Sequence, residues 1–152
     1  MTCFHCRALP SRSMTRAAVT RDGLAAGAVA AVVSGAPSTL HALATRASPI
    51  EATLAAGTLL LPRERRPLVL VLAATAVHIV LSLGWALVLA ALLPRRRTIA
   101  WASLAGIAIA ALDLGVVGRR FPRIRALPQP PQWLDHLAYG ATVGAVLSRR
   151  RR

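Results

Sequence analysis

Residues 67–93 read PLVLVLAATAVHIVLSLGWALVLAALL, and this stretch decides the fold class. It holds no full charge over 27 residues, and three arginines, Arg95 to Arg97, follow it. As a helix it would be about 40 Å long, enough to cross a hydrocarbon core of about 30 Å with some tilt. The stretch therefore predicts a transmembrane helix that ends at a basic loop.

The composition of the whole chain agrees with this prediction. The 152 residues are 55% hydrophobic and 16% charged, with a mean hydropathy of +0.54, whereas a soluble domain holds roughly a quarter charged residues. The 19 basic residues are all Arg, and with five acidic residues they set a net charge of +14. The absence of Lys also suggests a high-GC bacterial genome. Composition excludes a collagenous chain, a disulfide scaffold and a disordered protein.

Three further segments are apolar enough to cross a membrane: residues 23–43, 99–118 and 132–148. In the first, Pro37 removes a helical hydrogen bond and predicts a kink near Gly35. An alternative interpretation makes this segment a signal peptide cleaved after Ser34-Gly35-Ala36.

A shorter segment, residues 49–61, has the signals of a helix that does not cross. Ser48 is a candidate N-cap, Pro49 takes the first helical position, and Glu51 completes a capping box. At roughly 20 Å the segment is too short to span. The predicted fold is an all-α integral membrane bundle of about four transmembrane helices plus one re-entrant or interfacial half-helix.

The predicted domain organisation has three parts. Residues 1–19 form a disordered tail, 20–148 a single transmembrane domain, and 149–152 a basic C-terminal tail. Residues 1–13 are a start-codon extension if the chain begins at Met14, and their deletion is expected to leave membrane insertion unchanged. Cys3, His5 and Cys6 in this tail could supply part of a metal site, although a closed zinc site needs a fourth ligand.

Polar residues inside the apolar segments are predicted to gather near one face of the membrane. Consecutive spans run antiparallel, so the end of one span and the start of the next share a face. Ionisable residues at this depth normally face the protein interior with a partner. The predicted intramembrane polar cluster comprises Asp113, His78, Asp135, His136, His41, Ser38 and Tyr139.

The cluster supports three hypotheses. It is a structural network in which Asp113 shares a proton with His78 or His136, a path for a solute, ion or proton, or a metal centre built from its histidines and aspartates. The spacing matches no HExxH pattern, which disfavours the metal centre.

Small residues mark the faces where helices can approach closely. Ala102, Gly106 and Ala110 share a helix face with Asp113. Two GxxxG patterns, Gly23 to Gly27 and Gly140 to Gly144, permit close helix packing or dimerisation.

No catalytic motif accompanies these patterns. A nucleophile elbow, a Walker loop and a dinucleotide fingerprint are all missing, so the chain is expected not to be an enzyme and to need no cofactor. The arginines lie in short runs at span ends, which favours contact with anionic lipid headgroups over nucleic acid. With four crossings, eleven arginines lie on one side and eight on the other, so positive-inside counting predicts no orientation.

Three stretches carry a resemblance: 34–41 (SGAPSTLH), 57–62 (GTLLLP) and 112–122 (LDLGVVGRRFP), the last followed by DHLAYG at 135–140. Over about residues 20–148 the chain resembles small hypothetical polytopic membrane proteins of high-GC bacteria. The resemblance implies a membrane protein and transfers no site residue.

The expected function is that of a structural or accessory subunit of the bacterial cytoplasmic (inner) membrane, multi-pass, as a homo-oligomer or part of a larger assembly. The alternative is a small oligomeric transporter or channel that uses the polar cluster. A membrane-embedded metal-dependent enzyme is the third hypothesis.

Overall fold

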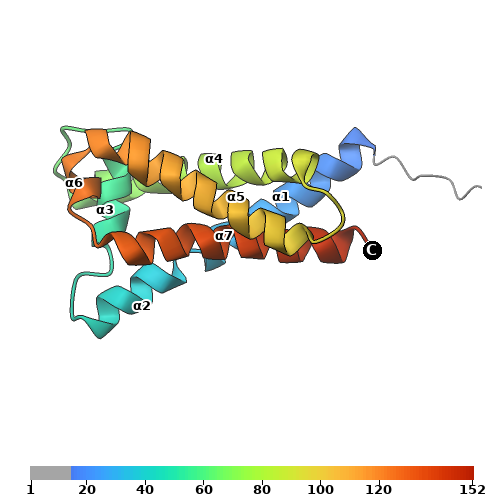
Figure 1. Ribbon diagram of the computed structural model, residues 1–152. Coiled ribbons are helices and arrows are strands. Elements are labelled where there is room, and N and C mark those ends of the chain that lie inside the picture. The colour runs from blue at the N-terminus through green and yellow to red at the C-terminus, as the bar shows by residue number, and fades with distance from the viewer. Residues whose placement is uncertain (1–14) are drawn as a thin grey trace, which may run out of the picture.

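The computed structural model describes residues 15–152, and these form an all-helical bundle in which 79% of the described residues are helical and none is in a strand (Figure 1). The bundle has two ends. The C-terminal end holds the start of the first helix, the loop 93–97 and residues 149–152. The opposite end, here called the α6 end, holds the connections 45–50, 62–66 and 118–128.

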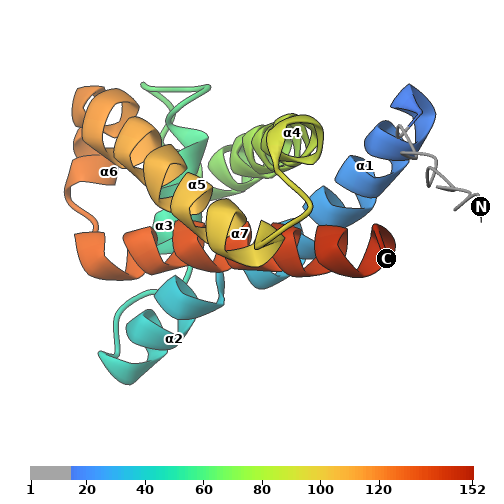
Figure 2. The same ribbon diagram turned by 45° about the vertical axis from the view of Figure 1, so that its right-hand side comes forward.

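The first predicted span consists of two helices, α1 (Arg16–Val33) and α2 (Ala36–Ala44), separated at Ser34 and Gly35. Pro37 lies in the first turn of α2, where its missing N–H costs nothing. The predicted kink is therefore confirmed, and α2 leaves the direction of α1 (Figure 2). Helix α1 begins at Arg16 because the Thr15 side chain accepts from the Ala18 N–H at 3.3 Å, so residues 16–19 of the expected tail are helical.

The predicted half-helix is present but shorter, as α3 (Glu51–Gly57), and the predicted capping box is wrong. The N-cap is Ile50, without a side-chain cap, and it is the Ser48 carbonyl that accepts from the Glu51 N–H, at 3.3 Å. The Glu51 carboxylate instead binds Arg123 Nε at 2.8 Å. The carboxylate that was expected to cap α3 therefore forms an ion pair with Arg123 of the short helix α6 (Pro122–Arg125).

The remaining helices alternate between the two ends. Helix α4 (Pro67–Leu92) and helix α5 (Thr98–Leu112) are joined by the loop 93–97, but α4 packs against α1 and α3 while α5 packs against α7. Helix α5 continues through a π-helical turn, η1 (Asp113–Val117), a 3₁₀ turn, η2 (Gly118–Arg120), and the short α6 (Pro122–Arg125). Helix α7 (Gln129–Arg150) then returns the chain to the C-terminal end.

Three described helical segments are long and apolar enough to cross a membrane: Arg16–Ala44, Pro67–Leu92 and Thr98–Arg120. The fourth predicted span is present as the 22-residue α7 but does not reach that hydropathy, because it includes Asp135, His136 and terminal arginines. The described chain is therefore an all-α protein with three candidate membrane spans.

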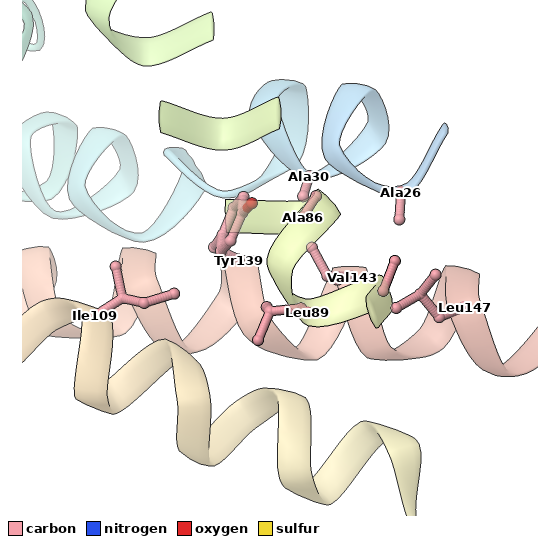
Figure 3. Close-up of a cluster of buried hydrophobic side chains, with 9 residues drawn as sticks. Ala26, Ala30, Ala86, Leu89, Ile109, Tyr139, Val143 and Leu147 are labelled. Atoms are coloured by element: carbon pink, nitrogen blue, oxygen red, sulfur yellow. The ribbon is translucent and has the colours of Figure 1, made fainter. Parts of the chain in front are cut away.

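Helix α7 lies at the centre of the bundle and packs against α5, α1 and α2 (Figures 1 and 2). From Asp135 to Ser148 none of its residues is exposed. The core around it is built mainly from small and aliphatic side chains. Those labelled in Figure 3 are Ala26, Ala30, Ala86, Leu89, Ile109, Tyr139, Val143 and Leu147.

Glycines set the closest helix contacts. A Cβ on Gly106 of α5 would lie 2.2 Å from the His136 carbonyl oxygen, and a Cβ on Gly140 of α7 would lie 2.2 Å from that of Ala102. Gly23 and Gly27 of α1 meet α4 in the same way, at about 3 Å from Ala90 and Ala86 Cβ. Both GxxxG patterns are thus used for packing within one chain.

Candidate functional site

The candidate site is the set of polar contacts that α7 makes with its neighbours. The first contact joins α7 to α2. Asp135 Oδ1 accepts from the backbone N–H of Ser38 at 2.9 Å. Ser38 lies in the first turn of α2, whose N-cap, Gly35, supplies no side-chain acceptor. The first N–H groups of a helix lack partners within it and carry partial positive charge, so Asp135 caps α2 from another helix.

The second contact joins α7 to the end of α5. His136 Nε2 lies 3.4 Å from Asp113 Oδ2, and both side chains are about one quarter exposed. His136 Nδ1 lies 2.8 Å from the Gln132 carbonyl oxygen, which only accepts, so Nδ1 carries a proton. The contact between Nε2 and the carboxylate matches one of the two partners predicted for Asp113.

Asp113 also begins the π-helical turn η1, at the point where α5 ends. A π turn holds one more residue than an α turn, and such turns are frequent at functional sites. Gly118, which follows it, donates its N–H to the Asp113 carbonyl. A Cβ on Gly118 would lie 2.8 Å from that same oxygen, so the wide turn needs glycine there.

Two more predicted residues bind backbone carbonyls and tie other helix pairs together. The Tyr139 hydroxyl donates to the Ser82 carbonyl and joins α7 to α4. His78 Nε2 lies 2.8 Å from the Ala31 carbonyl oxygen and joins α4 to α1. His41, by contrast, is exposed on α2 and makes no hydrogen bond with the other predicted residues.

The structure therefore brings most of the predicted residues together through individual hydrogen bonds and ion pairs, and Asp135 also lies within electrostatic range of His136 and His78. Asp113 meets His136, and Asp135 meets Ser38, while Tyr139 and His78 each bind a carbonyl of another helix. Within residues 15–152 no group of three or more His, Cys, Asp or Glu side chains is placed to hold a metal ion. The candidate ligands Cys3, His5 and Cys6 lie outside the described residues.

Sequence analysis missed the most buried carboxylate, Asp22 of α1. Its side chain is 3% exposed, and its Oδ1 lies 2.8 Å from Arg150 Nε and 3.5 Å from Arg21 Nε. Arg150 belongs to the last turn of α7, so part of the expected basic tail is helical and paired. The sequence did contain a signal for this pair. Asp22 is an acidic residue at the start of the first apolar segment, and the C-terminal arginines were expected on the same side of the membrane.

Electrostatics also organise the loop 62–66 between α3 and α4. The Glu64 carboxylate accepts from the Arg66 guanidinium at 2.9 Å and from the backbone N–H groups of Arg65 and Arg66. The side-chain bond to Arg66 is the main reason that the pKa of Glu64 falls to about 2. Glu64 thus stays ionised and holds the loop at the start of α4.

Comparison of the chain with known protein families, curated proteins and solved structures finds no match.

Proposed function

We propose that the chain is a structural or accessory subunit of a bacterial inner-membrane assembly, without enzymatic activity of its own. The observation that carries this proposal is the use of the interior polar groups. Asp135, His136 and Tyr139 each bind a group on a different helix, so their polarity serves to select and hold helix partners. In lipid, where hydrophobic burial does not drive helices together, such bonds and close packing of small residues supply the association energy.

The proposal includes a fourth crossing by α7. The helix is about 33 Å long, which matches a hydrocarbon core of about 30 Å. Its low hydropathy comes in part from Asp135, His136 and Tyr139, which already pair with other elements, and from Asp135 to Ser148 none of its residues is fully exposed. A central helix with little lipid-facing surface has no need to be apolar all round.

Large apolar side chains on the outside of the bundle favour a lipid or protein environment on several sides. On α4, Leu68, Leu72, Val80 and Leu92 are each more than 60% exposed. On α1 and α2, Val32, Leu40 and Leu43 are exposed to the same degree. Continuous apolar surface of this kind is rare on soluble monomers and is typical of membrane-facing or partner-facing helices.

Flux measurement separates this function from transport. We expect liposomes reconstituted with the purified protein and loaded with a pH-sensitive dye to show the same proton leak as empty liposomes. An ionophore added at the end confirms that the vesicles hold a gradient. Proton flux that the wild-type chain supports and Asp113→Asn abolishes would overturn the proposal.

Transport remains the second candidate, because of one observation. The Asp113–His136 pair is partly exposed. A cavity of about 300 Å³ is lined by residues that are close to the pair in sequence but include neither member of it: Leu114, Gly115, Arg119, Ile124, Arg125, Gln129 and Trp133. An ionisable pair that solvent can reach is what a proton-coupled path requires.

A further inference from the structure

A second cavity, of about 340 Å³, lies at the C-terminal end of the bundle, between the α4–α5 loop and the end of α7. It is lined by Arg95, Arg97, Thr98, Ile99, Ser148, Arg151 and Arg152. Four of the seven lining residues are arginines, and none is acidic. The cavity therefore favours an anion.

The hydroxyl groups of Thr98 and Ser148 already donate to backbone carbonyls, so they are not the groups that would donate to an anion in the cavity. Thr98 Oγ1 donates to the carbonyls of Pro94 and Arg95, and Ser148 Oγ donates to that of Ala145. Three of the lining arginines, Arg97, Arg151 and Arg152, differ from Arg150, which is paired with Asp22. Within residues 15–152 no carboxylate lies within salt-bridge distance of Arg97, Arg151 or Arg152.

Arg151 is held in place by the end of α4. Its two terminal nitrogens donate to the carbonyls of Leu93, at 3.1 Å, and Ala90, which are among the last carbonyls of that helix. Its Nε is buried and has no hydrogen-bond partner in the described part of the chain. Burial is the main reason that the pKa of Arg151 is lowered; Asp22 opposes this shift and Arg95 adds to it. An anion in the cavity would add a further stabilising charge near Arg151.

The N-terminus of α5 contributes a second source of positive potential. Thr98 and Ile99, the first two residues of the 15-residue helix, line the cavity. The N-cap, Arg97, provides no side-chain acceptor for the first N–H groups. Free N–H groups at a helix N-terminus bind phosphate well because they add directed donors to the helix dipole.

From these observations we infer that the cavity binds the phosphate of an anionic phospholipid headgroup. The cavity lies where α4 ends and α5 begins, at the level where headgroups meet two candidate spans. Ile99 lines it and is exposed, and Trp101, two residues later near the start of the same helix, is exposed as well, as is common for aromatic residues near the membrane interface. Basic pockets between membrane helices are known to hold such headgroups. This inference rests on the proposed membrane location.

Two arginines provide a matched test. Arg97 and Arg46 are the described non-glycine residues with positive φ, 55° and 57°. Glycine relieves the steric cost of that conformation at both positions. Arg97→Gly and Arg46→Gly therefore remove the same charge with the same backbone effect, but only Arg97 lines the cavity.

The experiment counts lipids bound to the detergent-purified full chain by native mass spectrometry, with phosphatidylglycerol or phosphatidylcholine added. We expect tighter binding of phosphatidylglycerol, weakened about fivefold by Arg97→Gly and unchanged by Arg46→Gly, the change expected for one arginine near a lipid surface. Arg152→Gln, which removes a charge without touching the loop, should weaken binding similarly.

Several results would overturn the inference: equal binding of the two lipids, equal effects of Arg97→Gly and Arg46→Gly, or wild-type binding by both cavity variants. Displacement of the lipid by an excess of inorganic phosphate would mean that the cavity is a free-phosphate site. Because binding is measured without flux, a transport activity would overturn the proposed function and leave this inference intact.

Discussion

At the residue scale, four of the predicted polar side chains, Asp135, His136, Tyr139 and His78, bind a group on another helix. Asp135 satisfies the N-terminus of α2, and His136 pairs with Asp113. Loss of one partner leaves the other polar group unpaired in an apolar site. This costs more free energy than the hydrogen bond itself contributes to stability. Replacing one partner is therefore more harmful than the net value of the pair suggests.

Substitution of Asp113 tests whether this pairing stabilises the fold. Asp113→Asn keeps the shape and an acceptor for His136, so we expect a small change in thermal stability in detergent. Asp113→Leu is more compatible with lipid but leaves His136 Nε2 without its partner, so we expect a loss of about 1 kcal/mol or more.

The double variant Asp113→Leu/His136→Leu sharpens the test. If the two side chains act as a pair, the second substitution should cost less in the Asp113→Leu background than in wild type. An Asp113→Leu protein as stable as its parent would mean that Asp113 does not contribute to a stabilising network.

At the element scale, α7 combines the least apolar sequence with the most central position. Its glycines allow the neighbouring helix α5 to pack closely against it. Gly140 and Gly144 lie against Ala102 and the first turn of α5, and Gly106 lies against the His136 carbonyl. The same close approach brings His136 within reach of Asp113, so packing and pairing depend on one helix interface.

Gly106→Ala tests this interface. Because its Cβ would lie 2.2 Å from a backbone oxygen, α5 and α7 must separate, and we expect a loss of roughly 1–3 kcal/mol in reversible unfolding. Gly84→Ala on α4 is the matched control, since a Cβ there meets nothing within 4 Å. It should be neutral or slightly stabilising, because alanine favours helix. Equal effects of the two substitutions would contradict the close α5–α7 contact.

At the scale of the whole molecule, the arrangement of the ends predicts a membrane topology. The connections 45–50 and 62–66 lie at the α6 end, on either side of α3, and the loop 93–97 lies at the other end with residues 149–152 (Figure 1). The seven residues of α3 cover about 10 Å, far less than a membrane. The helix therefore returns to the side on which it began.

Cysteine labelling in intact cells checks this topology. We expect an impermeant maleimide to label cysteines placed at Arg46 and Arg63 from the same side, and cysteines at Arg96 and Arg152 from the opposite side. Labelling of Arg46 and Arg63 from different sides would mean that α3 crosses. Labelling of Arg152 on the same side as Arg46 would mean that α7 does not cross.

Three helices long and apolar enough to cross a membrane, and the break before Pro37, could be predicted from the sequence alone. These follow from local causes: hydropathy summed along a segment, and a proline that lacks an N–H. Local signals failed where a distant residue competed for the same group, as Arg123 did for Glu51. Only the tertiary structure decided that Asp113 pairs with His136 and not His78, and that Asp22 binds Arg150. Those pairings depend on helix rotation and separation, which close contacts such as Gly106 against α7 determine across the bundle.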